Sequence, residues 1–431
     1  MARAKKKAAL TPEERLQAAL VPDWEWPYKL PENWCWLKLV ESFDNHTDSK
    51  KKIKQKDYLV KGKLAVVDQG QELIGGYTND VEKSYSGALP IVIFGDHTRC
   101  IKFVDFPFAQ GADGVKVLRP KPFYLPKAFY YALQSVNIPN LGYRRHFPLF
   151  NKFSIPLPPF AEQQRIVDRI ESLFAKLDEA KEKAQTVVDS FETRKATILH
   201  KAFTGELTKK WRKSANTRWV YKKIKDCCKL GSGGTPSRKV PDFYKGDIPW
   251  IKTGEIEWND IYDTEEKITQ SAIDNSSARC YKPGVVLVAM YGMGVTRGKA
   301  SILRVQAATN QAVCVLEPQS ALLYNRYLLY YFMRNYWDIR EKAVGGNQLN
   351  LSLTIIKELN IEIPPIDEQM KIVQILDNLF AKEQQTKEAA EAVLDQINLM
   401  KKSILARAFR GELGTNDPSE ESAVELLKQI I

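Results

Sequence analysis

The spacing of apolar and polar residues is repeated in two long stretches of the chain. In residues 158–207 apolar or small side chains recur at steps of four and three, and residues 364–413 show a similar spacing. The two stretches align without a gap, and about 23 of their 50 positions are identical, which indicates an internal duplication. Such spacing places an apolar stripe along a helix, so each stretch is predicted to be one long helix.

The ends and stripes of the two predicted helices match. Each helix starts at a Pro-Pro pair, and Gly205 and Gly411 stand where a left-handed C-terminal cap is favoured. The matching stripes favour antiparallel pairing of the two helices as a coiled coil, with Glu383 and Thr386 interrupting the second stripe. Two unrelated amphipathic helices in one core are the alternative. The residues predicted to form the seam are Ile166, Ile170, Leu173, Val187, Phe191, Ile372, Leu376, Leu379, Val393 and Ile397.

Shorter elements are predicted between and around these helices. Thr11 and Glu14 form a capping box that opens a helix ending near Val21. Runs of apolar and β-branched residues between Gly, Asn and Asp turns predict strands at 63–67, 89–94, 101–106, 285–290, 302–305 and 312–316. Further helices are predicted at 125–134, 321–342 and 419–431.

The order of elements predicts an α+β protein with alternating parts. A chain of 431 residues is too long for one ordinary core, and two mixed α/β globular domains alternate with the two long helices. This arrangement can approximate a two-fold object, which suits a ligand with two half-sites. The expected parts are an N-terminal helix and linker (1–32), a first globular domain (33–157), a first helical region (158–210), a second globular domain (211–362), a second helical region (363–413) and a tail helix (414–431).

Charge and composition narrow the class of partner. Lys and Arg number 64 against 52 Asp and Glu, a net charge of +12 that suits a polyanion such as nucleic acid. Six cysteines and four histidines show no metal-ligand spacing, so no metal site is predicted, and free cysteines suit a reducing cytoplasm. No stretch is apolar enough to span a membrane, and the basic start leads into a charged helix, so no signal peptide is expected.

The motifs of common enzymes are incomplete in this chain. Gly292 to Lys299 resembles a phosphate-binding loop, but Ala300 replaces the hydroxyl residue that would hold magnesium. Leu157 precedes Pro-Pro-Phe where amino-methyltransferases place a polar residue. A short pattern of carboxylates and lysine from Asp242 to Lys267 resembles a nuclease site, but chance explains it better. No catalytic residue is therefore predicted.

Residues suited to DNA contact gather in loops. A basic run begins at Lys50, a polar turn lies at residues 95–99 and a Gly-rich loop lies at residues 231–239. Such loops can neutralise phosphates or read base edges, and solvated or structural turns are the alternative. The predicted DNA-binding residues are Lys50, Lys51, Lys52, Gln69, Gln71, His97, Thr98, Arg99, Lys116, Thr235, Ser237, Arg238, Lys252, Arg297 and Lys299.

Several motifs together resemble the specificity subunit of type I restriction-modification systems. Each helical region carries Pro-Pro…Glu-Gln…Ile-Val near its start and closes on Ala-Phe-x-Gly-Glu-Leu. The globular domains resemble target recognition domains, with Val-Asp-Gln-Gly-Gln at 67–71 and Phe-Gly-Asp-His-Thr-Arg at 94–99 in the first. The second carries Gly-Gly-Thr-Pro-Ser at 233–237 and Thr-Asn-Gln-Ala at 309–312. The match covers nearly the whole chain.

The resemblance implies a non-catalytic subunit that binds double-stranded DNA. Each recognition domain would read one half of a bipartite asymmetric site, and the helices would set the spacer. Two modification subunits that methylate adenine N6 would dock on the helices, and motor-nuclease restriction subunits would join them. S-adenosylmethionine, ATP and Mg²⁺ are expected on these partners, with no cofactor on this chain.

Other functions remain open from the sequence alone. A specificity subunit of a modification-only or related phage-defence methyltransferase, without a nuclease partner, is the alternative. A nuclease or methyltransferase with unrecognised motifs, and a coiled-coil scaffold that binds no DNA, are the rivals from other classes.

Overall fold

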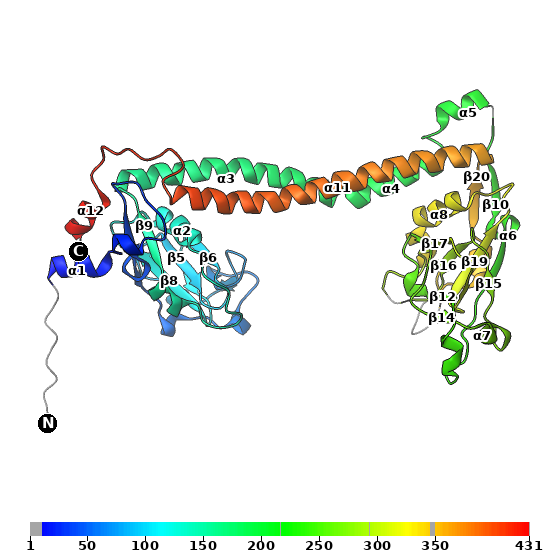
Figure 1. The fold of residues 1–431 in the computed structure, drawn as a ribbon, viewed down its shortest axis with the longest axis horizontal. Helices are drawn as coiled ribbons and strands as arrows, with labels where there is room; N and C mark the ends of the chain where they lie inside the picture. The colour runs from blue at the N-terminus through cyan, green and yellow to red at the C-terminus, as the bar shows by residue number, and fades with distance from the viewer. Residues whose placement is uncertain (1–10, 216, 293, 345–349, 431) are drawn as a thin grey trace. The chain divides into compact units, whose positions relative to one another are not determined.

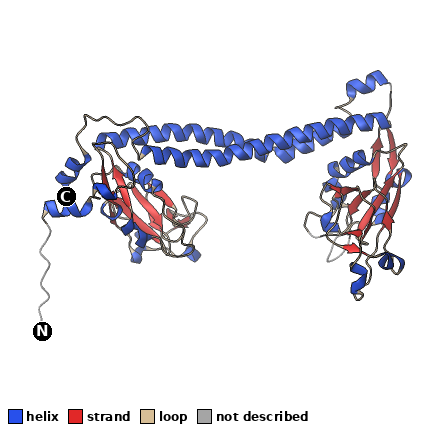
Figure 2. Ribbon diagram, in the orientation of Figure 1, coloured by secondary structure: helices blue, strands red, loops and turns tan. Residues whose placement is uncertain are grey.

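The computed structural model describes residues 11–215, 217–292, 294–344 and 350–430. The chain divides into two compact units, residues 1–184 with 392–431 and residues 185–391. Each unit contains one domain rich in strands and one stretch of paired helices (Figures 1 and 2). The predicted α+β class, with two mixed domains and long paired helices, is confirmed.

The first β-rich domain is built on two small sheets and one strand pair. Its strands are β1 (Cys35–Lys38), β2 (Phe43–Asn45), β3 (Leu64–Val67), β4 (Gly76–Thr78), β5 (Ile91–Gly95), β6 (Ile101–Val104), β7 (Phe108–Gln110), β8 (Val115–Pro120) and β9 (Ser154–Leu157). One sheet has the antiparallel order β2-β8-β5-β6. The other has the order β4-β3-β7 with β3 and β7 parallel. Strands β1 and β9 pair antiparallel, which brings the two ends of the domain together.

The second β-rich domain repeats this strand order with a different sequence and with one additional strand in each sheet. Its strands are β10 (Val220–Lys223), β11 (Cys228–Ser232), β12 (Ile248–Ile251), β13 (Asp260–Ile261), β14 (Lys267–Ile268), β15 (Cys280–Tyr281), β16 (Val286–Ala289), β17 (Ala300–Leu303), β18 (Ala307–Thr309), β19 (Val313–Pro318) and β20 (Asn360–Ile363). The order β11-β19-β16-β17 matches β2-β8-β5-β6, and the parallel pair β12-β18 matches β3-β7. The additional strands are β13 in the first of these sheets and β15 in the other. The pair β10-β20 closes this domain as β1-β9 closes the first.

The helices pack on these sheets and on one another. Their bounds are α1 (Pro12–Ala19), α2 (Pro126–Ser135), α3 (Phe160–Asp189), α4 (Phe191–Phe203), α5 (Lys209–Ala215), α6 (Ile224–Cys227), α7 (Gln270–Asp274), α8 (Asn325–Arg334), α9 (Tyr336–Glu341), α10 (Leu353–Lys357), α11 (Ile366–Ala408) and α12 (Ala423–Ile430). Helix α2 packs on β5, β6 and β8, and α8 packs on β16 and β17. These two helices connect the sheets to the long helices.

Most of the predicted shorter elements are confirmed. Strands lie in all six predicted stretches, and α1 starts with the predicted capping box of Thr11 and Glu14. Gly205 and Gly411 both have a φ of +74°, as the predicted caps require. The prediction of one helix at 321–342 is wrong, because the chain forms α8 and α9 with a break at Asn335.

The prediction that each helical region is one continuous helix holds only for α11. In the first region the helix is interrupted between α3 and α4 at Ser190. The Ser190 hydroxyl donates a hydrogen bond of 2.6 Å to the Thr186 carbonyl. A serine side chain that competes for a backbone carbonyl in this way bends or interrupts a helix.

In the first unit, the beginning of α3 packs against the end of α11 in antiparallel orientation. Ile166 and Ile170 are fully buried in one hydrophobic cluster with Leu405 and Phe409. Further along, Lys401 pairs with Asp178 at 2.5 Å. The predicted pairing of the two helical regions is therefore present in this unit.

The second unit shows the same antiparallel pairing between α4 and the first part of α11. Ile372 and Leu376 are fully buried in one cluster with Leu199 and Phe203. The predicted seam residues Leu173, Val187, Phe191 and Leu379 are partly buried in their respective units.

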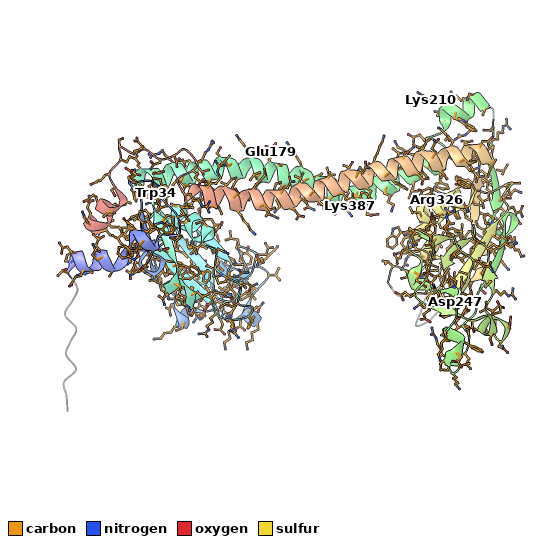
Figure 3. All side chains as sticks on the ribbon, viewed as in Figure 1. Trp34, Glu179, Lys210, Asp247, Arg326 and Lys387 are labelled. Carbon is orange, nitrogen blue, oxygen red and sulfur yellow. The ribbon has the colours of Figure 1, made fainter. Side chains whose placement is uncertain are left out.

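Two details of the predicted seam are wrong. Val393 is 39% exposed, and the half-buried Leu394 takes the inward position between the buried Ala390 and Ile397. Thr386 is also exposed, and the inward position beside it belongs to Lys387, whose ammonium lies 5.0 Å from the Phe191 ring centroid (Lys387 is labelled in Figure 3). Steps of four and three fit both choices at each site, so the spacing alone did not distinguish them.

The repeated Gln of the Pro-Pro…Glu-Gln motif ties each long helix to its β-rich domain. The Gln163 side chain accepts from the Leu125 N–H at 2.7 Å and donates to the Phe123 carbonyl at 2.9 Å. Gln369 makes the same pair of contacts with Tyr324 and Leu322, both at 2.8 Å. Both glutamines are fully buried, so the motif fixes the start of α2 and α8 on the long helices.

The repeated Glu of the same motif holds the segment that covers each helix start. Glu162 accepts from the Trp34 indole at 2.6 Å and from the Asn416 amide at 2.8 Å (Trp34 is labelled in Figure 3). Glu368 accepts from the Thr208 hydroxyl at 2.7 Å and from Arg212 at 2.9 Å. In the first unit this covering is supplied by segments near both chain ends, which places them side by side.

Candidate nucleic-acid interface

One glutamine joins three loops at the end of the first β-rich domain. The Gln69 amide oxygen accepts from the His97 N–H at 3.2 Å, and its amide nitrogen donates to the Asp113 carbonyl at 3.1 Å. The Gln69 carbonyl accepts from the Thr98 hydroxyl at 2.6 Å. Because both ends of the amide are engaged, Gln69 holds the loops together and is not free to read a base.

Two predicted DNA-binding residues near this cluster differ in their freedom. The ammonium of Lys116 lies 4.0 Å from the buried Asp96 carboxylate and 5.2 Å from the Phe147 ring centroid. Lys116 is therefore already engaged by groups of its own domain. Gln71 is exposed, and its side chain has no hydrogen-bond partner in the ranges that the structure describes. Gln71 is therefore available to a ligand.

A buried lysine forms an ion pair with the loop that follows β3. Lys102 is 5% exposed, and its ammonium lies 3.4 Å from the Asp68 carboxylate. Burial lowers the pKa of Lys102, and the neighbouring Asp68 opposes this shift. The pair joins β6 to the loop after β3.

A buried aspartate and histidine fasten a fourth loop to the same place. One Asp96 carboxylate oxygen accepts from the N–H groups of His146 at 2.9 Å and Phe147 at 2.7 Å. His146 is fully buried, and its Nε2 accepts from the Leu141 N–H at 3.0 Å. Its Nδ1 therefore carries the hydrogen and donates to the Asp96 carbonyl at 2.9 Å.

Residues 139–145, between these anchors, form an exposed loop rich in arginine that sequence reasoning missed. Tyr143 is 86% exposed, and its ring stacks on His97 with a centroid distance of 4.8 Å and an interplanar angle of 14°. Arg144 and Arg145 are exposed and have no ion pair or hydrogen bond within the described part of the chain. The sequence signal was the Tyr-Arg-Arg-His cluster itself.

The basic run is only partly free. Lys51 donates to the Ser84 carbonyl at 3.0 Å, and Lys52 lies 3.8 Å from Asp113. The side chains of Lys50, Lys54 and Lys56 are exposed and lack partners among the described residues. Their free ammonium groups can neutralise phosphates.

Arg99 does not have the exposed position that the sequence suggested. It is half-buried, its φ is +61°, and its guanidinium donates to the Ile138 carbonyl at 2.9 Å. Arg99 therefore holds the turn after β5 against the segment after α2. The turn between β5 and β6 places His97 and Thr98 nearer to solvent.

The Gly-rich loop of the second domain is packed, whereas the sequence suggested a flexible loop with free N–H groups. The Gly234 N–H donates to the Thr309 carbonyl at 2.9 Å, and the Gly234 carbonyl accepts from the Trp250 indole at 3.0 Å. A Cβ on Gly233 would lie 1.8 Å from the Thr309 carbonyl oxygen, so only glycine fits there. The Gly-rich loop is therefore held in place by its close backbone contact with Thr309.

Exposed hydroxyl groups follow directly after these glycines. Thr235 donates to the side-chain oxygen of the exposed Gln311, and Ser237 is exposed beside it. The Ser237 hydroxyl can donate and accept hydrogen bonds at base edges, and the Thr235 hydroxyl oxygen can still accept one.

The predicted cations of this loop region are held in a charge network. The guanidinium of Arg238 lies 2.7 Å from Glu266 and 4.0 Å from the Tyr244 ring centroid. Lys252 pairs with the same Glu266 at 2.9 Å. The hydrogen bond from Lys252 lowers the pKa of Glu266, burial raises it, and Arg238 lowers it further. The net effect is a lowered pKa.

The cations of the β16-β17 loop also have partners. Lys299 forms an ion pair with Glu257, and its side chain is 12% exposed. Burial, with Arg340 adding repulsion, lowers the pKa of Arg297. Arg340 donates to the Arg297 and Gly294 carbonyls, both at 2.6 Å, so an inward-facing arginine supports this loop.

Two general features complete the description of the surface. Within the described ranges, no group of three or more His, Cys, Asp or Glu side chains could hold a metal ion. No helix in the same ranges is both long enough and apolar enough to cross a membrane.

Comparisons with known proteins agree on one family. The family model for the type I restriction modification DNA specificity domain matches residues 31–187 and 216–394. The EcoR124I/EcoR124II specificity subunit of Escherichia coli is 25% identical over 79% of this chain and 85% of its own length. The EcoKI specificity subunit of Escherichia coli K12 is 26% identical over 65% of this chain and 64% of its own length.

Solved structures show the same fold at lower identity. The HsdS subunit from Thermoanaerobacter tengcongensis is 17% identical with a TM-score of 0.55, over 90% of this chain and 99% of that one. A chain from a structure of a type I R-M system is also 17% identical, with a TM-score of 0.62, over 90% of this chain and all of that one. With its two matched regions, the chain belongs to the type I restriction modification DNA specificity family and is a specificity subunit for DNA target recognition.

Proposed function

We propose that each β-rich domain of this specificity subunit reads one half of a bipartite, asymmetric double-stranded DNA site. The observation that carries the proposal is the repetition of one topology with unlike loop residues. Equal folds can meet DNA in the same way, and unlike loops then select different bases. The predicted boundaries, 33–157 and 211–362, are proposed as the two target recognition domains.

The proposed interface of the first domain is its loop end. It contains the exposed or half-exposed residues Gln71, His97, Thr98 and Lys50, with Lys51, Lys52 and Lys116 as partly engaged cations. Gln69 and Arg99 are proposed to position these loops, because their polar groups already have partners.

The proposed interface of the second domain is the group of loops around the Gly-rich stretch. Thr235 and Ser237 are proposed to contact DNA directly, since both are exposed. Arg238, Lys252, Arg297 and Lys299 need to exchange their present contacts for DNA before they can take part.

The paired helices are proposed to dock two modification subunits and to set the spacer between the half-sites. Restriction subunits would join this complex, which would act in the cytoplasm. S-adenosylmethionine, ATP and Mg²⁺ would be held by the partners, and this chain would bind DNA without catalysing a step. The buried motif glutamines support the spacer role, since they fix each domain to its own helices.

Methylation mapping tests the proposal. The chain alone should leave DNA unmethylated in the presence of S-adenosylmethionine, and the chain with its modification subunits should methylate a two-part sequence. Methylation by the purified chain alone, or a single undivided target, contradicts the proposal.

The spacer role has its own test, an insertion of four residues into each paired helix. Insertions after Ala184 and after Leu394 keep the antiparallel pairing and lengthen each helix by about 6 Å. DNA rises about 3.4 Å per base pair, so the preferred gap should grow by one or two base pairs. An unchanged gap in a folded variant contradicts the spacer role.

A further inference from the structure

The loop of residues 139–145 in the first recognition domain has no structural task that explains its arginines. Its end residue His146 is buried, but the preceding Arg144 and Arg145 extend into solvent with no partner in the described part of the chain. An unpaired surface arginine is ordinary by itself. Two adjacent ones beside an exposed aromatic ring, on a loop fixed at both ends, indicate a binding element.

The loop is fixed before any ligand arrives. The His146 ring accepts the Leu141 N–H at one end, and Asp96 accepts the N–H groups of His146 and Phe147 at the other. The His97 ring also contacts the Tyr143 carbonyl at 3.1 Å. Little conformational entropy is therefore lost when the loop binds, which favours selective contact.

The loop lies against the residues already proposed to contact DNA. Tyr143 stacks on His97, and the Gln69 contacts join His97 to the loops after β3 and before β8. The arginines therefore extend the same surface. Arg144 and Arg145 add two free guanidinium groups to this surface. The other arginine there, Arg99, is already hydrogen-bonded to the Ile138 carbonyl.

We propose that this loop enters the major groove of the half-site read by the first domain, where Arg144 or Arg145 binds a guanine edge. A guanidinium donates two parallel hydrogen bonds, and guanine offers O6 and N7 as two acceptors in the matching geometry. The major groove, about 12 Å wide, admits a structured protein element of this kind. Tyr143 and His97 support the loop as a stacked pair. The inference rests on the proposed function and names the side chains that carry part of its specificity.

The test uses the full chain assembled with its modification subunits and a DNA library with randomised half-sites. The variants are Arg144→Ala, Arg145→Ala, the double alanine variant and the corresponding single lysine substitutions. In the wild-type complex one position of the first half-site should require guanine. One alanine variant should reduce that preference by roughly 10- to 100-fold and leave the second half-site unchanged.

The lysine variants separate a base contact from a structural or purely electrostatic role. Lysine keeps the charge but lacks the two-pronged geometry, so it should retain general affinity and still lose the guanine preference. The matched control is Arg119→Ala, an exposed arginine of the same domain at the other end of β8 from this loop. This control should keep the complete wild-type sequence preference.

The outcomes are distinct. A loss of methylation that is equal on all sequences means a phosphate contact and overturns the proposal, as does an unchanged preference in the double alanine variant. If thermal melting shows that an alanine variant is unfolded, the lysine variants supply the test. Loss of the guanine preference in one of them supports the proposal, and an unchanged preference in both overturns it. A wild-type complex without a two-part target would contradict the proposed function itself, whatever the variants do.

Discussion

The loop ends of the two recognition domains use one topology to present charge in different ways. In the first domain the segment after α2 supplies Arg144 and Arg145, both exposed and without partners in the described part of the chain. In the second domain the segment after α8 turns Arg340 inward onto the carbonyls of Arg297 and Gly294.

The cations of the second domain that were predicted to bind DNA are also engaged by groups of the domain itself. Arg238, Lys252 and Lys299 of the second domain are each paired with a glutamate. Free guanidinium groups favour attraction to phosphates and guanine, while paired cations leave hydroxyl and amide groups as the available readers. The comparison suggests that a shared fold does not imply a shared chemistry of readout.

The largest expected effect is a complete change of one half-site. Replacing residues 211–362 with the equivalent segment of a relative that has another target should change the second half-site and keep the first. Each mismatched base pair costs about 1–3 kcal/mol, so several changed positions should abolish methylation of the original target. Methylation mapping of the exchanged protein measures this. A change in both half-sites would show that the domains do not read independently.

The next effect concerns the anchor of the arginine loop. Asp96→Ala removes the acceptor of the Phe147 N–H, whereas the His146 N–H keeps the backbone carbonyl of residue 96 at 2.8 Å. The unfolding free energy should therefore fall by about 1–3 kcal/mol. Asp96 is 2% exposed, so water cannot easily replace the carboxylate. Denaturant unfolding measures the loss, and preference at the first half-site should fall with it.

The matched control for the anchor is Asp113→Ala in the same group of loops. The Asp113 side chain is fully exposed, and its contact with Lys52 is 3.8 Å long. Such a surface contact contributes little, so stability should change by less than about 0.5 kcal/mol. Equal destabilisation by both variants would contradict the anchoring role of Asp96.

A smaller effect is expected when a paired cation of the second domain is released. Glu266→Gln leaves Arg238 and Lys252 without their shared carboxylate. Binding to non-specific DNA should become tighter, and the salt dependence should steepen by about one or two released counterions. Glu265→Gln is the control, because the exposed Glu265 side chain has one contact among the described residues, with Lys252 at 3.4 Å. An unchanged salt slope in Glu266→Gln would show that these cations lie away from DNA.

The smallest effect is a dependence on pH in the same network. The pKa of Glu266 lies below its usual value of 4.5, so the folded domain favours the charged carboxylate. The stabilisation is present above pH 4.5 and is lost as the pH falls through the lowered pKa. Because Arg238 lies 5.2 Å from the Trp250 ring centroid, tryptophan fluorescence should change in this range. Subtracting the profile of Glu266→Gln isolates the signal, and identical profiles would contradict the assignment.

The sequence determined the architecture because its signals are local and repeated. The duplicated stripe predicted the paired helices, and the glycine caps and capping box fixed helix ends through contacts only a few residues long. The order of domains and the family likeness also followed from the sequence. The break at Ser190 escaped prediction, because a serine inside a helix forms such a bond in one setting and faces solvent in another.

Only the tertiary structure decided which polar residues are free to bind. Asp96 meets His146 across 50 positions of sequence, and Arg99 meets Ile138 across 39. Arg238, in the Gly-rich loop, forms an ion pair with Glu266, which directly precedes β14. The sequence therefore assigned Arg99 and Arg238 to DNA and overlooked Arg144 and Arg145. An arginine's availability depends on whether a carboxylate or carbonyl lies within about 3 Å, and only the fold brings such distant groups together.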